Sequence, residues 1–211
     1  MPPSHPQDHW ESVYRSKQPD AVSWFAPHLA TSLELMKAAG LNDESRVIDI
    51  GAGASTLVDD LLDSGVKHLI AVDLAEASLA IARERLGARA EDVQWIAEDV
   101  TCLKLPSRSI DIWHDRAALH FLVDEESVQR YVDVATQAVV PGGHAVIGGF
   151  AADGPEKCSG LPVARRSPQE LAALFAPHFE LIQERHETHL TPWGSPQKFA
   201  FVLLRKSLSP P

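Results

Sequence analysis

Residues 46–55 have the sequence Arg-Val-Ile-Asp-Ile-Gly-Ala-Gly-Ala-Ser, and the rest of the chain is organised around them. Residues 47–50 are mostly β-branched and apolar, as in a strand buried on both faces of a parallel sheet. Gly51 and Gly53 follow, and glycine lets a ligand approach the main chain closely. Residues 56–62 then place leucines at helical spacing. Strand, glycine turn and helix in this order predict the start of a nucleotide-binding βαβ unit.

The residues around the glycine turn distinguish two classes of cofactor. A dinucleotide-binding turn has a third glycine where Thr56 stands, so that helix and strand pack closely around a pyrophosphate. Asp49, just before the first glycine, would repel a pyrophosphate but suits a cationic ligand. S-adenosylmethionine is such a ligand, because it carries an ammonium and a sulfonium. An ordinary tight turn without a ligand is the alternative.

Length and charge limit the possible classes of protein. A chain of 211 residues with 45% hydrophobic residues predicts one domain with a large core. The net charge of −10 argues against nucleic-acid binding, which needs clustered Lys and Arg. No apolar run reaches the length of a membrane span, and the first residues lack the apolar core of a signal peptide. We therefore expect no nucleic-acid or membrane partner. A monomer or homodimer is expected.

Cysteine use indicates the compartment and argues against a metal site. Cys102 and Cys158 are the only cysteines, so a disulfide framework is not expected. No compact set of His, Cys and acidic residues stands out, and no metal is predicted. The reducing cytoplasm is the expected location.

The first 41 residues are expected to form a helical cap ahead of the sheet. Trp10 and Tyr14 lie at helical spacing, and a second helix is expected to end at Gly40. Trp24 lies between the two helices. These aromatic side chains either pack in the core or close over a ligand, since an aromatic face suits a sulfonium.

Acidic residues end two further predicted strands. Asp73 ends strand 68–73, at the distance beyond the glycine turn where a ribose diol is held in βαβ units. Asp99 ends strand 93–99. Asp73 could instead cap the next helix, and Asp99 could be a solvated strand end. Together with Asp49, however, they place three acids at successive strand ends, where open α/β sheets bind ligands.

The second half of the chain continues the alternation of strands and helices. The sequence predicts strands over 109–113, 144–150, 179–190 and 199–205, and helices over 79–86, 128–140 and 168–175. Residues 141–143, Pro-Gly-Gly, are expected to stop the helix before them. Ser167 and Glu170 are expected to cap the last helix. The Gly- and Pro-rich residues 151–166 are expected to form a long loop, which is usually functional or disordered.

These features together resemble the class I S-adenosylmethionine-dependent methyltransferases over residues 10–205. The matching marks are the Asp-x-Gly-x-Gly turn at 49–53, Asp73, Asp99-Val100, the strand ending at Trp113 and residues 141–143. The resemblance implies a single-domain, Rossmann-like α/β fold. Its seven-stranded sheet would have helices on both faces and an antiparallel last strand. The expected division is an N-terminal helical cap or lid (1–41), the methyltransferase domain (42–206) and a frayed tail (207–211).

Two subgroups of that family compete for the closer resemblance. Thiopurine-type small-molecule S-methyltransferases have an Asp-Arg-x-Ala-Leu run after the fourth strand, as residues 115–119 do here, and aromatic residues in the N-terminal helix. Elongation-factor-type protein-lysine methyltransferases share the Trp10-x-x-x-Tyr14 and Trp24-Phe25 patterns. They typically have acid-Lys-Gly in place of Asp115-Arg116, so the small-molecule group is favoured. Residues 156–160 do not map onto the thiopurine enzymes.

The resemblance also implies roles for individual residues. S-adenosylmethionine, and its product S-adenosylhomocysteine, would be held by Trp10, Tyr14, Trp24, Asp49, Gly51, Ala52, Gly53, Asp73, Leu74, Asp99, Val100 and Asp115. Asp99 and Val100 stand where this family holds adenine.

The candidates for catalysis follow the fourth predicted strand: His114, Asp115, Arg116 and His120. A thiol acceptor needs only a nearby cation to help it ionise, whereas an amine or hydroxyl needs a base. His186 and His189 on a later strand are weaker candidates, because their spacing places them on opposite faces. The expected activity is methyl transfer to a small nucleophile, with a soft atom such as a thiol favoured. The alternatives are a protein-lysine methyltransferase and a binding module without catalysis.

Overall fold

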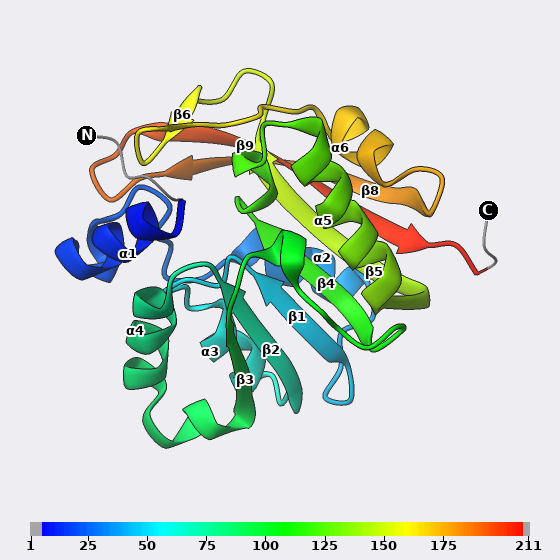
Figure 1. Ribbon diagram of the computed structural model, residues 1–211, viewed down its shortest axis with the longest axis horizontal. Helices are drawn as coiled ribbons and strands as arrows, with labels where there is room; N and C mark the ends of the chain where they lie inside the picture. The colour runs from blue at the N-terminus through cyan, green and yellow to red at the C-terminus, as the bar shows by residue number, and fades with distance from the viewer. Residues whose placement is uncertain (1–5, 209–211) are drawn as a thin grey trace.

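A seven-stranded sheet forms the centre of the computed structural model, which describes residues 6–208 (Figure 1). Its strands are Arg46–Ile50 (β1), His68–Asp73 (β2), Val93–Ala97 (β3), Ile110–Arg116 (β4), Val139–Phe150 (β5), Phe179–Leu190 (β8) and Pro196–Lys206 (β9). They lie in the order β3-β2-β1-β4-β5-β9-β8. The first five strands are parallel, and β9 runs antiparallel to both β5 and β8. The predicted α/β fold with an antiparallel last strand is therefore confirmed.

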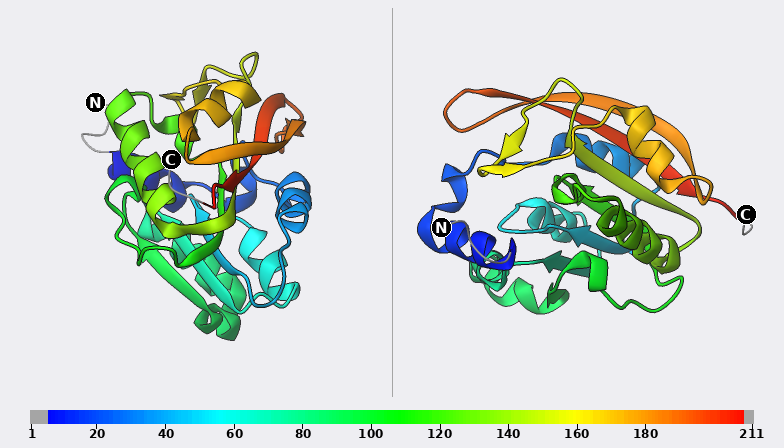
Figure 2. Two further views of the ribbon diagram at one scale, coloured as in Figure 1. Left: turned by 90° about the vertical axis from the view of Figure 1, so that its right-hand side faces the viewer. Right: turned by 45° about the horizontal axis from the view of Figure 1, so that its top comes forward.

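Helices cover both faces of the sheet (Figure 2). They are Pro6–Ser16 (α1), Ala30–Ala38 (α2), Leu57–Asp63 (α3), Glu76–Leu86 (α4), Glu125–Ala138 (α5) and Pro168–Phe175 (α6). Residues of α5 and α6 pack into one buried cluster with one face of the sheet. Residues of α2, α3 and α4 pack into a second cluster with the other face. The predicted Ser167–Glu170 capping box at the start of α6 is present.

Short elements complete the chain. Four 3₁₀ helices span Pro19–Ala21 (η1), Gly87–Asp92 (η2), Val100–Cys102 (η3) and Leu119–Phe121 (η4). The expected loop 151–166 contains a small antiparallel pair, Lys157–Cys158 (β6) with Leu161–Pro162 (β7). Within residues 6–208 we find no helix that combines the length and apolar character needed to cross a membrane.

Several boundaries differ from those predicted. β3 ends at Ala97, so Asp99 lies two residues beyond the strand and caps η3. Two further differences concern β4 and β5. β4 continues past Trp113 to Arg116, so His114, Asp115 and Arg116 belong to the strand instead of following it. α5 ends at Ala138, and Pro141–Gly143 lies inside β5. A Cβ on Gly143 would lie 2.9 Å from the Asp111 carbonyl oxygen. The glycine therefore allows close approach of β5 to β4 and does not stop the helix.

The two N-terminal helices have different neighbours. α2 contacts β4 and β5, whereas α1 contacts α4. The division of the chain at residue 41 stays a prediction. Of the predicted tail 207–211, Ser207 donates to the His178 carbonyl at 2.9 Å, and residues 209–211 lie outside the described residues. Residues 1–5, on which the signal-peptide argument rests, also lie outside them.

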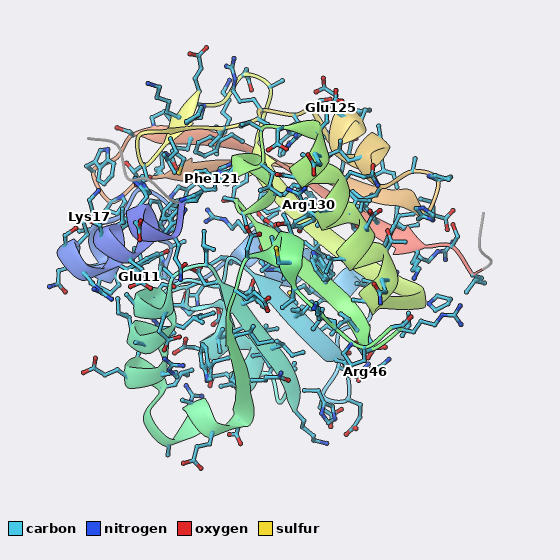
Figure 3. The ribbon with its side chains drawn as sticks, viewed as in Figure 1. Glu11, Lys17, Arg46, Phe121, Glu125 and Arg130 are labelled. Atoms are coloured by element: carbon cyan, nitrogen blue, oxygen red, sulfur yellow. The ribbon has the colours of Figure 1, made fainter. Side chains whose placement is uncertain are left out.

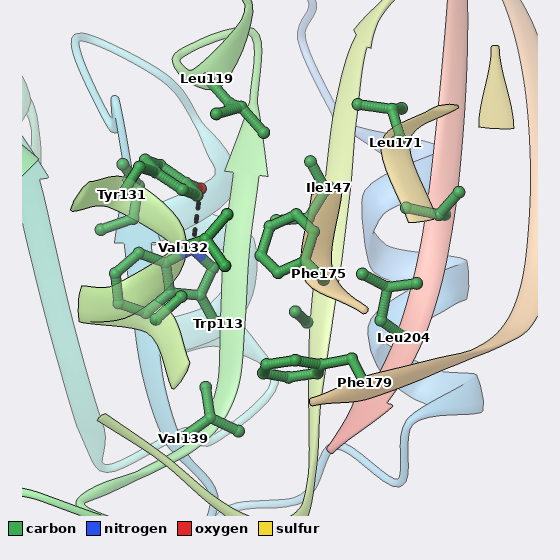
Figure 4. Close-up of a cluster of buried hydrophobic side chains, with 14 of the residues drawn as sticks. Trp113, Leu119, Tyr131, Val132, Val139, Ile147, Leu171, Phe175, Phe179 and Leu204 are labelled. Atoms are coloured by element: carbon green, nitrogen blue, oxygen red, sulfur yellow. Dashed lines mark hydrogen bonds between the residues drawn. The ribbon is translucent and has the colours of Figure 1, made fainter. Parts of the chain in front are cut away.

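A buried hydrogen-bonded chain ties β4 to α5, and Figure 4 shows its link between Trp113 and Tyr131. The Trp113 indole Nε1 donates to the Tyr131 hydroxyl at 2.8 Å, and that hydroxyl donates to Asp115 Oδ2 at 2.7 Å. Trp113, Tyr131 and Asp115 are each fully buried. Because unpaired buried polar groups are costly, this chain fixes how α5 lies on the sheet.

We expect Tyr131→Phe to destabilise the protein by about 1–3 kcal/mol, because Trp113 loses its acceptor and Asp115 loses a donor. Urea unfolding measures the change. Gln129→Ala, on the exposed side of the same helix, serves as the control and should change stability by less than about 0.5 kcal/mol. Equal stability of both variants would show that the buried chain contributes nothing.

Candidate functional site

The glycine turn lies at the carboxyl end of β1 and has no room for side chains. Gly51 and Gly53 have φ angles of +67° and +55°, a region that favours glycine. A Cβ on Gly51 would lie 2.7 Å from the Ala118 Cβ, and one on Gly53 would lie 2.6 Å from the Tyr14 hydroxyl. The main chain of the turn is therefore packed between the end of β4 and helix α1.

Below this turn, Asp49, His114 and Ser32 form a buried hydrogen-bonded series. His114 Nδ1 lies 2.6 Å from Asp49 Oδ1, and His114 Nε2 lies 2.8 Å from Ser32 Oγ. All three residues are at most 2% exposed. Both ring nitrogens of His114 therefore have hydrogen-bond partners within the protein, and neither is free to act as a base toward a methyl acceptor.

The second oxygen of Asp49 is different. Asp49 Oδ2 is buried and has no hydrogen-bond partner within the part of the chain that the structure describes. Asp49 lines a cavity together with Tyr14, Trp24, Gly51 and Arg116. A buried carboxylate oxygen in a cavity wall is suited to a cationic donor such as an ammonium.

Asp73 and Asp99 each already use one oxygen in a local bond. Asp73 Oδ1 accepts from the Ala75 amide at 2.8 Å. Asp73 Oδ2 faces the turn, 3.6 Å from the ideal Cβ position on Gly53. Burial raises the pKa of Asp73 to about 6, against hydrogen bonds that lower it. Asp99 Oδ1 accepts from both the amide and the hydroxyl of Thr101 at 2.8 Å.

Three further residues of the predicted cofactor set, Ala52, Leu74 and Val100, lie next to the glycine turn and the acids and would contribute mainly main-chain atoms to the site. The Ala52 amide donates to the Val72 carbonyl at 2.9 Å, which joins the turn to β2. Leu74 follows Asp73 and is half-buried, and Val100 begins η3 directly after Asp99. These residues therefore surround the carboxyl ends of β2 and β3.

Asp115 shapes the turn after β4. Asp115 Oδ1 accepts from the Ala118 amide at 2.8 Å, and Oδ2 accepts from the Leu119 amide at 3.0 Å as well as from Tyr131. Ala117, inside this turn, has a φ of +73°. Burial raises the pKa of Asp115 to about 6. With both oxygens engaged and no exposed surface, Asp115 positions main chain instead of facing the cavity.

Arg116 connects the sheet to the N-terminal segment. Arg116 Nη1 donates to the Trp24 carbonyl at 3.1 Å, and Nη2 lies 3.6 Å from a carboxylate oxygen of Glu187. Its guanidinium lies over the Phe199 ring at 4.6 Å, and the side chain is 7% exposed. The site therefore contains a buried cation next to the cavity.

The later histidines have separate environments. His120 is buried, and its Nδ1 accepts from the Phe150 amide at 3.4 Å. His189 is buried and its Nε2 bonds the Ser23 carbonyl at 2.8 Å, whereas His186 is exposed. His189 thus holds the N-terminal segment, and the two β8 histidines do not share a pocket.

Aromatic side chains gather beside the cavity, which Tyr14 and Trp24 line. The ring of Trp10 lies 5.6 Å from that of Trp24 and 5.0 Å from that of Phe121, which Figure 3 labels, and the ring of Tyr14 lies 6.2 Å from that of Trp24. Burial strongly raises the pKa of the Tyr14 hydroxyl, which stays protonated. The three predicted aromatic residues therefore lie together over the glycine turn.

Sequence reasoning missed Ser32 and Glu187. Ser32 occupies the apolar face of α2 with Leu35 and Met36, and a serine at such a position could have signalled a buried polar partner. Glu187 faces Arg116 from β8, which is far away in sequence. No local pattern indicates that contact.

Comparison with known proteins agrees with this geometry. Residues 47–143 match the family model described as methyltransferase domain. The eEF1A lysine and N-terminal methyltransferase of Mus musculus is 29% identical over 128 residues, which are 60% of this chain and 18% of that protein. The chain thus spans less than a fifth of the length of this relative.

Solved structures match over most of the chain. Burkholderia thailandensis 1,6-didemethyltoxoflavin-N1-methyltransferase, with bound 1,6-didemethyltoxoflavin and S-adenosylhomocysteine, is 25% identical with a TM-score of 0.68. The match covers 85% of this chain and 77% of that one. N-methyltransferase NodS of Bradyrhizobium japonicum, in complex with S-adenosylhomocysteine, shares the fold at 15% identity with a TM-score of 0.73, over 95% of this chain and 97% of that one. Over residues 47–143 the chain thus matches a methyltransferase domain, and the glycine turn and the acids at the strand ends suit S-adenosylmethionine as the cofactor of a class I methyltransferase.

Proposed function

We propose that this domain moves the methyl group of S-adenosylmethionine to a small nucleophilic acceptor, with a thiol or similarly soft atom favoured. The observation that carries the proposal is that Asp49 and Arg116 line the same cavity. Asp49 Oδ2 has no partner among the described residues, and Arg116 brings a guanidinium. The carboxylate suits the ammonium of the cofactor. The guanidinium suits an acceptor that reacts as an anion.

The cofactor would lie across the carboxyl ends of the first three strands. In this arrangement Asp49 Oδ2 accepts from the ammonium, and Asp73 accepts from the ribose hydroxyls. Asp99 and the Val100 amide bind adenine, and Trp10, Tyr14 and Trp24 close over the sulfonium. His114 and Ser32 act as positioning residues, because their hydrogen bonds hold Asp49 Oδ1 and leave Oδ2 for the ligand.

The chemical step is a displacement at the methyl carbon. The acceptor sulfur uses a lone pair to form a bond to that carbon as the carbon–sulfonium bond breaks. The electron pair of the broken bond stays on the cofactor sulfur, which becomes the neutral thioether of S-adenosylhomocysteine. The thiol proton leaves to solvent before the step. The protein needs to hold the two atoms in line and exclude water, and Arg116 favours the thiolate.

A protein-lysine acceptor is the second candidate, because the mouse relative is named for that activity. The cation at Arg116 argues against it, since a lysine ammonium would approach a like charge. A module that only binds the cofactor is the third candidate. Release of S-adenosylhomocysteine with thiols, amines or carboxylates would exclude it. The cytoplasm remains the compartment that we propose.

We expect cofactor affinity to fall below about pH 6, because protonated Asp73 cannot accept from both ribose hydroxyls. The pKa of Asp73 near 6 sets this window: the ligand binds the ionised form, so affinity is full above that pH and is lost as pH falls through it. Calorimetry of S-adenosylhomocysteine from pH 5 to 7.5 measures it. Asp73→Asn should bind weakly with no such dependence, whereas Asp99→Asn should bind weakly and keep it. Identical pH profiles for Asp73→Asn and wild type would refute this role.

We expect Arg116→Ala to slow methylation of 2-mercaptoethanol most at neutral pH, with the deficit shrinking as pH rises above the pKa of the thiol. Arg116→Lys keeps the charge and should retain part of the rate. Loss of the Trp24 contact would instead lower the rate equally at every pH. Burial, with Arg116 and Arg166 nearby, lowers the pKa of His120 to about 3, so the profile should lack a histidine limb near pH 6.5. A rate for Arg116→Ala equal to wild type at neutral pH would exclude thiolate stabilisation by Arg116.

We also propose that residues 6–29 act as a lid that the cofactor orders. This segment contacts the domain through the Trp10–Phe121 ring pair, the packing of α1 against α4 and a few polar bonds. Amide hydrogen exchange in α1 should slow on adding S-adenosylhomocysteine, while exchange in α5 should not change. Unchanged exchange in α1 would eliminate the lid.

A further inference from the structure

Two buried donor groups near the end of β5 have no partner within residues 6–208, and the proposed transfer does not use them. They are Nε2 of His120 and Nη1 of Arg166. His120 is 2% exposed and Arg166 is half-buried. Because a buried polar group without a partner is costly, such groups call for a ligand.

Phe150 holds both residues beside the same edge of β5. The Phe150 amide donates to His120 Nδ1, and the Phe150 carbonyl accepts from the Arg166 amide at 3.1 Å. The Ala164 amide donates to the His120 carbonyl at 2.8 Å. The segment that carries Arg166 therefore runs beside η4, which carries His120.

The hydrogen bond to Nδ1 determines which nitrogen of the His120 ring carries the proton. Since Nδ1 accepts from the Phe150 amide, the ring proton lies on Nε2, which is a donor. Burial, with Arg116 and Arg166 nearby, keeps His120 neutral, because its pKa falls to about 3. His120 therefore adds a directed N–H bond without adding charge.

Acceptors near these donors are already engaged. Glu170, the acid nearest Arg166, accepts from the amide and hydroxyl of Ser167 in the capping box. Glu187 faces Arg116. Cys158 is buried, and burial raises its pKa to about 11, so it is a neutral thiol. The environment of His120 thus has two guanidinium groups and an N–H donor that lacks an acceptor.

The side chains around His120 are aromatic. The His120 ring lies edge-on to Phe121, labelled in Figure 3, at 4.4 Å and to Phe150 at 4.9 Å, and Phe121 contacts Trp10 of the lid. Apolar walls with a few placed polar groups are typical of small-molecule sites.

We propose that His120 Nε2 and Arg166 Nη1 bind a carboxylate of the methyl acceptor, so that the acceptor is a small anionic molecule with an apolar or aromatic body. This inference rests on the proposed function, because it names the substrate class of that enzyme. Two donors on separate side chains match the two oxygens of a carboxylate. The same positive field opposes a lysine ammonium.

The binding test compares benzoate with benzamide, which has the same shape and no charge, on protein saturated with S-adenosylhomocysteine. Calorimetry should show benzoate binding roughly tenfold or more tighter, the size expected for charge-assisted bonds. Arg166→Gln should remove the preference. Arg165→Gln is the matched control, since Arg165 is exposed and pairs with Glu156. His120→Phe keeps the aromatic packing and should lower the preference as well.

The transfer test compares 3-mercaptopropionate with 2-mercaptoethanol by release of S-adenosylhomocysteine. The carboxylate thiol should have the higher kcat/KM, and Arg166→Gln should remove that advantage. Equal binding of benzoate and benzamide by wild type, or an unchanged preference in folded Arg166→Gln, would overturn the anionic site and leave the methyltransferase proposal intact. A benzoate preference that depends on Arg166, with no transfer to any thiol, would instead refute the proposed thiol chemistry alone.

Discussion

The buried carboxylate of Asp115 is the constraint on which both halves of the site depend. It needs donors because it has no contact with water, and it takes them from the Tyr131 hydroxyl and the amides of Ala118 and Leu119. The Tyr131 bond fixes α5 against the sheet. The two amide bonds fix the turn after β4, including the left-handed Ala117. The same turn places Ala118 against Gly51, and His120, two residues later, lies against Gly149 of β5. One ionisable group thereby sets the distance between the cofactor turn and the proposed acceptor site.

The acids at the strand ends look equivalent in sequence, but the structure uses each differently. Asp49 gives one oxygen to His114 and keeps the other unpaired. Asp73 holds an amide of its own turn, and Asp99 caps η3 from an exposed position. The sequence positions of the three acids therefore indicate a ligand-binding edge of the sheet. The carboxylate oxygens that remain free of hydrogen bonds determine which ligand groups each acid can accept from.

The fold could be predicted because its signals are local. β-branched runs, the glycine turn and the Ser167–Glu170 capping box each depend on residues close in sequence, and the structure confirms them. The end of β4 was misplaced because His114 and Asp115 are polar, and their buried partners Ser32, Asp49 and Tyr131 come from other elements. Pro141–Gly143 was misread because a proline–glycine run is typical of a helix stop, whereas here glycine permits close approach of two strands. Arg166 stands next to Arg165 in the sequence, and nothing local distinguishes the two. The Arg166 nitrogen that has no partner within the described residues becomes visible only in three dimensions.

The connection between α1 and α2 is held at two consecutive carbonyl groups. His189 of β8 bonds the Ser23 carbonyl, and Arg116 of β4 bonds that of Trp24. Main chain held from two strands cannot move without breaking both bonds, so the lid that we propose pivots there and opens at α1. It would give the cleft one rigid rim and one hinged rim. The width available to an acceptor is determined at the rigid rim, while the rate of its entry and release depends on the hinged one.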